Sequence, residues 1–149
     1  MDIYHSIHTI TLQRKIPLEE VSSYRSLLYG LSDRYGTGSY RKSENEYYFY
    51  MYAPQGVMIS LRAARNCGFI KLTINLNSLL YMEIQRVALF SSCPDYMRTL
   101  DRNLRDILQD AQLGTPETFK FARVDFSVNA QTLDPLAYIA LAHRGGVPN

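Results

Sequence analysis

Apolar and polar residues alternate along one stretch near the end of the chain, Arg123-Val124-Asp125-Phe126-Ser127-Val128-Asn129. Successive side chains of a pleated strand point to opposite faces, so Val124, Phe126 and Val128 share one face. We expect these three residues in the hydrophobic core, within a strand over residues 119–130. The polar residues then share the other face, which indicates a sheet with one buried face.

A second alternating stretch predicts another strand of the same sheet, Ile70-Lys71-Leu72-Thr73-Ile74-Asn75-Leu76-Asn77. Further strands are expected over residues 3–13, 47–53 and 57–62, and the polar, glycine-bearing residues 36–46 are expected to form a loop. Pro54-Gln55-Gly56 and Asn66-Cys67-Gly68 have the composition of tight turns. Short turns between neighbouring strands favour antiparallel pairing.

Helical periodicity appears in four other segments, residues 18–35, 79–89, 95–112 and 134–143. The third has the clearest apolar stripe: Tyr96, Leu100, Leu104, Ile107, Leu108 and Ala111. Together the elements predict one α+β domain over residues 1–149. It has a mostly antiparallel sheet of about five strands, helices packed on one face, and a flexible tail at residues 144–149.

Length and composition limit the class of protein. A chain of 149 residues with a hydrophobic fraction of 46% can bury one continuous core. A net charge of +2 neither demands nor excludes nucleic acid. Cys67 and Cys93 have no metal-ligand spacing, the N-terminus lacks a signal-peptide pattern, and no apolar run reaches the ~18 residues of a membrane span. We expect a cytoplasmic protein that does not enter a membrane.

Motifs for the common catalytic mechanisms are missing from the sequence. It has no Gly-x-Ser-x-Gly nucleophile elbow and no glycine-rich phosphate loop leading into a helix. We therefore assign no catalytic residue.

Tyrosine is unusually frequent, with 12 residues in the chain. Tyr48, Tyr50 and Tyr52 follow one another at every second position, and a strand would place all three on one face. Such a face can stack single-stranded bases, bind a protein partner, or pack beneath a helix with its hydroxyls at the edge. The sequence leaves these three interpretations open.

Basic residues cluster around the tyrosine strand: Arg41, Lys42, Arg62, Arg65 and Lys71. Cations beside exposed aromatic rings are typical of surfaces that bind single-stranded or distorted nucleic acid. With Tyr48, Tyr50, Tyr52 and Arg123, these residues form the predicted surface for nucleic acid or a partner.

Asp125 is the one candidate metal ligand. Arg123, Ser127 and Asn129 share its face. The carboxylate is placed either to help hold Mg²⁺ or Mn²⁺ or position a phosphate, or to form an ion pair with Arg123 or a helical arginine. No other cofactor is expected.

The run Phe121-Ala122-Arg123-Val124-Asp125-Phe126-Ser127-Val128-Asn129 resembles a strand of replication-initiation proteins from Gram-positive plasmids, phages and integrative elements. The resemblance implies a DNA-binding fold and, for Asp125, a place as metal ligand. In that family a nicking tyrosine lies downstream of this strand, and no tyrosine here matches its motif.

Three functions follow as hypotheses, the third of which keeps enzymatic nicking through Asp125 and an unassigned tyrosine. The first is a DNA-binding module of a phage or other mobile element, which resembles the N-terminal part of an initiator without its nicking tyrosine. The second is a small non-enzymatic inhibitor that binds and blocks a host defence protein, as an anti-CRISPR protein does.

Overall fold

The computed structural model describes residues 2–81 and 94–131 of the chain. Nine helices and strands lie within these two ranges, together with short 3-10 turns at Leu18–Glu20, Ala53–Gln55 and Pro116–Thr118. The nine are β1 (Asp2–Pro17), α1 (Val21–Tyr35), β2 (Ser39–Ser43), β3 (Glu46–Phe49), β4 (Val57–Ala63), β5 (Cys67–Asn75), α2 (Leu76–Tyr81), α3 (Pro94–Asp110) and β6 (Lys120–Gln131).

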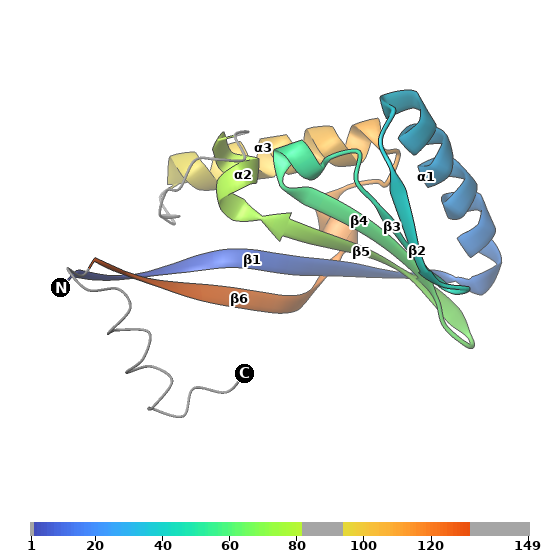
Figure 1. The fold of residues 1–149 in the computed structure, drawn as a ribbon, viewed down its shortest axis with the longest axis horizontal. Coiled ribbons are helices and arrows are strands. Elements are labelled where there is room, and N and C mark those ends of the chain that lie inside the picture. Colours follow the sequence, from blue (N-terminus) through green and yellow to red (C-terminus); the bar gives the residue numbers. More distant parts are fainter. Residues whose placement is uncertain (1, 82–93, 132–149) are drawn as a thin grey trace.

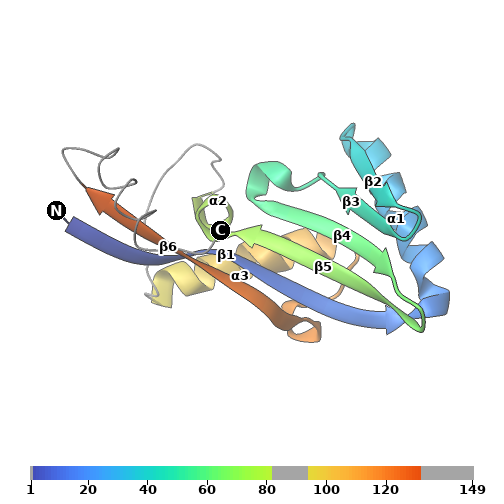
Figure 2. The same ribbon diagram turned by 60° about the horizontal axis from the view of Figure 1, so that its bottom comes forward.

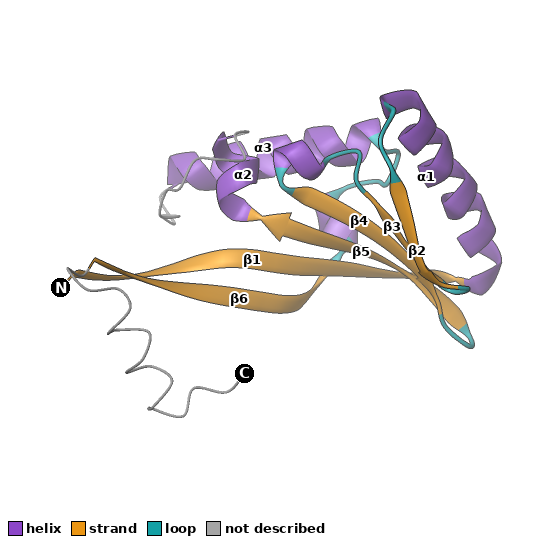
Figure 3. Cartoon of the chain, viewed as in Figure 1, coloured by secondary structure: helices purple, strands orange, loops and turns teal. Residues whose placement is uncertain are grey.

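The strands form one six-stranded sheet in the order β2-β3-β4-β5-β1-β6, and every neighbouring pair is antiparallel. All three helices lie on the same face of this sheet (Figures 1 and 3). Figure 2 turns the opposite face toward the reader, and none of the described helices covers it. The prediction of an α+β fold with an antiparallel sheet and helices on one face is confirmed.

The core lies between the sheet and the helices. Ile70, Leu72 and Ile74 of β5 are fully buried, whereas the residues between them are only half-buried, as their alternation predicts. Leu28 of α1 and Leu108 of α3 close the core from the helix side. Each such aliphatic side chain contributes about 1.5–3 kcal/mol when it leaves water.

The two long helices follow the expected pattern. In α3 the residues Leu100, Leu104, Ile107 and Leu108 are buried, which confirms the predicted apolar stripe. Helix α1 ends where Gly36 adopts a left-handed conformation with φ of +64°. Glycine adopts this conformation without a steric penalty, so it marks a helix end well.

Residues 36–46 were expected to form a loop, and this expectation is wrong for β2. Ser39 pairs with Phe49, and Tyr40 pairs with Tyr48, which makes β2 an edge strand of the sheet. All five residues of β2 are exposed, so the strand has no apolar face to reveal it. Its existence depends on the pairing partner rather than on its own composition.

Val124 was expected in the core, but its side chain is 37% exposed. The reason is topological, because β6 is the last strand of the sheet and α3 covers its inner face incompletely. The side chains of Phe126 and Val128 lie outside the described part. The expected helix at residues 134–143 and the expected tail at residues 144–149 also lie outside the described part. The expected helix at residues 79–89 is described only at its start, which belongs to α2.

Candidate functional site

The sheet face opposite the helices carries two rows of side chains that the register places side by side. The first row crosses five strands and contains Tyr40, Tyr48, Ser60, Lys71 and Gln13. The second row is displaced from the first by two residues on each strand. It contains Glu46, Arg62, Phe69 and Lys15. We call this surface the open face.

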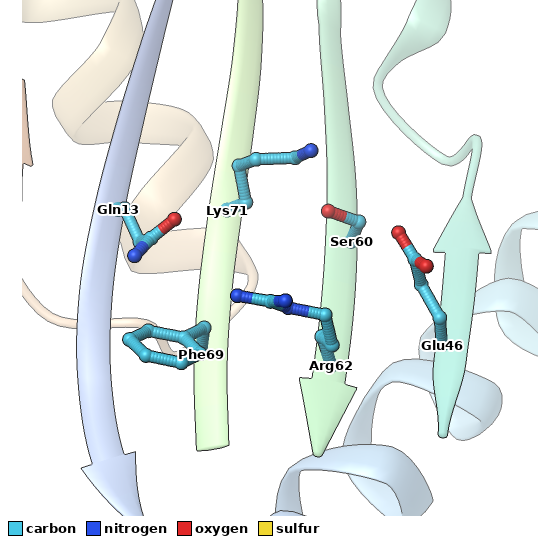
Figure 4. A pocket seen from close by; sticks show the side chains of 6 residues that line it. All are labelled: Gln13, Glu46, Ser60, Arg62, Phe69 and Lys71. Carbon is cyan, nitrogen blue, oxygen red and sulfur yellow. The ribbon is translucent and has the colours of Figure 1, made fainter. Parts of the chain in front are cut away.

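A groove of about 300 Å³ is hollowed into the open face where the two rows meet (Figure 4). Its six lining residues come from four strands: Gln13, Glu46, Ser60, Arg62, Phe69 and Lys71. Figure 4 shows Arg62 of β4 reaching toward Phe69 of β5. The guanidinium carbon lies 4.9 Å from the ring centroid, within the range of a cation–π contact. This contact orients Arg62 along the groove floor.

An aromatic pair extends the groove toward the edge of the sheet. The rings of Tyr40 and Tyr48 have centroids 6.2 Å apart and planes tilted by 35°. Tyr40 is 55% exposed, so its ring is available to a flat ligand. Tyr50, which follows β3, is half-buried and near enough to Tyr48 to affect its pKa.

Glu46 is the acidic member of the groove, and it holds Tyr48 in place. The Tyr48 hydroxyl donates a hydrogen bond of 2.6 Å to Oε1 of Glu46. This hydrogen bond, with a smaller effect of burial, raises the pKa of Tyr48 to about 12. Tyr48 is therefore a neutral hydrogen-bond donor at any physiological pH.

A second hollow of about 550 Å³ shares Gln13 and Phe69 with the groove. It adds the side chains of Lys15 and Lys120, which are both exposed. Five cations thus line the two hollows, against the single carboxylate of Glu46: Arg14, Lys15, Arg62, Lys71 and Lys120. The open face presents a positive field with aromatic rings in it.

The sequence predicted that Tyr52 shares a face with Tyr48 and Tyr50. This prediction is wrong. Strand β3 ends at Phe49, and the Ala53 amide donates to the Tyr50 carbonyl in a turn, so the alternation stops before Tyr52. The Tyr52 side chain is 4% exposed. Its hydroxyl donates a hydrogen bond of 2.6 Å to Oδ2 of Asp110 on α3, and burial together with this bond raises the pKa of Tyr52.

Three of the predicted basic residues lie away from the groove. Arg41 pairs with Tyr47, whose ring belongs to the helix side of the sheet, and its guanidinium lies 5.6 Å from that ring. Lys42 falls in the register irregularity of β2, where it is exposed. Arg65 is exposed in the turn between β4 and β5. Of the five clustered residues, the fold brings Arg62 and Lys71 together.

Arg123 and Asp125 occupy the part of the open face on β6. They pair with Thr11 and Thr9 of β1, and Nε of Arg123 lies 2.8 Å from Oδ1 of Asp125. The expected ion pair is therefore formed. Within residues 2–81 and 94–131 no group of three or more His, Cys, Asp or Glu side chains is placed to hold a metal ion. A metal at Asp125 stays a prediction.

Sequence reasoning missed Gln13, Lys15, Tyr40, Glu46 and Phe69 as members of the surface. For Phe69 a signal was present, because it lies two residues before Lys71 on the same strand and therefore on the same face. For the others the cross-strand register was needed.

No protein-family model, no curated protein and no solved structure matches this chain. The resemblance of residues 121–129 to replication initiators thus remains a prediction. Nor is any helix in the described ranges long and apolar enough to cross a membrane.

Proposed function

We propose that this protein binds single-stranded DNA across the open face, as a non-enzymatic module of a mobile element. The observation that carries the proposal is the groove in which Arg62 lies against Phe69 beside Lys71, with the rings of Tyr40 and Tyr48 next to it. Backbone phosphates fit the cations, and unpaired bases stack on the rings, with about 1–3 kcal/mol per stacked base. The resemblance of the β6 sequence to an initiator strand points to the same ligand.

Shape favours a single strand over a duplex. The groove is about 300 Å³ in volume, and all of its lining residues come from strands in the surface of the sheet. A splayed single strand can lay its bases on a sheet surface while its phosphates reach the cations that line the groove. The proposal assigns no chemical step to the protein.

Binding of a labelled oligodeoxynucleotide, followed by fluorescence anisotropy at roughly 50 to 200 mM salt, tests the proposal. The double variant Arg62→Ala/Lys71→Ala should bind more weakly. Its salt dependence should be shallower by about 1.4 in the slope of log K against log salt, because two phosphate contacts of about 0.7 each are lost.

The matched control is Arg98→Ala/Arg102→Ala, which removes the same charge from exposed positions on α3, on the other side of the sheet. Its affinity should stay close to that of the natural protein. Equal losses in the two double variants, or no binding by the natural protein at the lowest salt, would overturn the proposal.

A second function is favoured by one feature of the same groove. Glu46 gives it a carboxylate among the cations, and surfaces of mixed charge match protein partners better than a phosphate chain. This feature supports the alternative of a small inhibitor that binds a host defence protein. If the natural protein has no affinity for DNA at low salt, the inhibitor becomes the leading proposal.

A further inference from the structure

Strand β6 is an edge strand of unusual length. Eleven of its 12 residues pair with β1 on one side, with a register shift at Ala122, and among the described residues no strand pairs with its other side. Every second residue of β6 therefore directs its backbone N–H and C=O groups away from the sheet. A long edge of this kind is a template for a further strand unless charge, proline or a covering element blocks it.

Apolar side chains are exposed along the same edge. Six large hydrophobic residues are exposed in the described part of the chain, and Met97, Phe121 and Val124 are three of them. All three line one apolar groove of about 650 Å³ between α3, β1 and β6. Phe121 is 73% exposed, which is the largest value among the six. The apolar surface is thus concentrated beside the unpaired backbone.

The charges around Val124 identify the partner. Arg123 and Asp125 flank Val124 and lie on the open face. If a second copy of β6 pairs antiparallel with the first about a two-fold axis at Val124, Arg123 lies opposite Asp125 of the other copy, and Asp125 lies opposite its Arg123. Both cross-strand pairs have opposite charges, which stabilises antiparallel pairing. The segment is complementary to itself.

We propose that the protein forms a two-fold symmetric dimer through antiparallel pairing of β6 with β6, centred on Val124. The axis is perpendicular to the sheet, so two six-stranded sheets join into one, and the helices of both copies lie on the same side. The exposed Val124 side chains of the two copies meet at the axis, and Phe121 of each copy lies opposite residue 127 of the other. The two open faces become continuous.

Molar mass in solution is the first test, measured by light scattering on a size-exclusion column and by sedimentation velocity. The monomer mass is 17.1 kDa, and the expected species at micromolar concentration has twice this mass. A mass that stays at the monomer value up to about 100 μM would overturn the proposal, since a specific dimer interface gives tighter association.

A cysteine at the axis tests the register. In a background with Cys67→Ser and Cys93→Ser, the variant Val124→Cys places two thiols opposite each other, within the Cα separation of about 4.4–6.8 Å that a disulfide needs. Mild oxidation should convert most of it to a covalent dimer that a reductant reverses. The control Ser22→Cys, at an exposed site on α1, should stay monomeric on the same gel. Equal cross-linking of the two variants would overturn the register.

Exchanging the charges of Arg123 and Asp125 gives a test that does not depend on loss of folding, because the double variant should regain the dimer. The change Arg123→Asp puts two carboxylates opposite each other and should weaken dimerisation at least tenfold. The double change Arg123→Asp/Asp125→Arg restores opposite charges and should restore the dimer. Failure of the double variant to recover, with an unchanged melting curve, would count against the pairing. Because the measurements contain no DNA, their outcome is independent of the proposed function.

Discussion

Asp110, the last residue of α3, connects three parts of the structure through its carboxylate. The hydroxyls of Tyr35 and Tyr52 both donate to Oδ2, and Nη2 of Arg34 lies 3.6 Å from Oδ1. The hydrogen bond from Tyr35, followed by that from Tyr52, lowers the pKa of Asp110 below its ordinary value. This cluster ties the end of α1 and the turn after β3 to the end of α3.

We expect Asp110→Asn to reduce the free energy of unfolding by about 1 kcal/mol at neutral pH, because charge-assisted hydrogen bonds are lost and the partly exposed site weakens each of them. A lowered pKa means that this stabilisation is complete above the unfolded-state value of about 3.8 and is lost as the pH falls through the folded-state value. The two proteins should therefore become equally stable in acid. Urea unfolding from pH 7 to about pH 2.5 measures the difference.

Asp106→Asn is the matched control, one helical turn earlier on α3 and exposed. It should leave the unfolding free energy unchanged. If Asp110→Asn and Asp106→Asn behaved alike at every pH, the carboxylate cluster would not stabilise the fold.

At the scale of elements, the start of α1 packs directly against the beginning of β5. Gly68 makes this approach possible: a Cβ atom there would lie 2.4 Å from Cγ2 of Val21 and 3.0 Å from Cγ1 of Ile16. All three residues are buried. The first turn of α1 is thus held at a distance from the sheet that only a glycine allows.

We expect Gly68→Ala to lower the unfolding free energy by about 1–3 kcal/mol, since the added methyl group overpacks the site. Gly30→Ala is the contrasting variant, because a Cβ there meets nothing within 4 Å and the residue lies in the exposed middle of α1. It should raise stability by about 0.5–1 kcal/mol through helix propensity. Thermal melting of both variants measures the two changes, and a stable Gly68→Ala protein would contradict the packing argument.

At the scale of the whole molecule, the sheet separates two environments. The helix side holds the core, whereas five cations and one carboxylate line the two hollows. This asymmetry is local, since the net charge of the chain is only +2. A summed field over one face, rather than the total charge, would attract a phosphate chain.

We expect Glu46→Gln to increase the affinity for single-stranded DNA about two- to fivefold, because one repulsive charge near the phosphates is removed. Anisotropy titration at low salt measures the effect, which should fade as salt rises. An unchanged or weaker affinity would mean that the DNA does not pass over the groove.

The candidate site was partly predictable. Arg62, Lys71 and Tyr48 were anticipated, because alternation within a strand assigns a face to each residue. Glu46 and Lys15 were not, since they reach the groove only through pairing between strands distant in sequence. The predicted face of Tyr52 was wrong, because β3 ends at Phe49 and a turn follows. The alternation of faces does not continue through this turn.

The sequence by itself determined the α+β class, the buried stripes of β5 and α3, and the end of α1 at Gly36, because these follow from short-range periodicity and from glycine geometry. Only the tertiary structure decided that β2 is a strand, that β6 lies at an edge with Val124 exposed, and that Arg62 meets Phe69. Strand order and register are non-local, and no repeating pattern within one segment encodes which segment lies beside it.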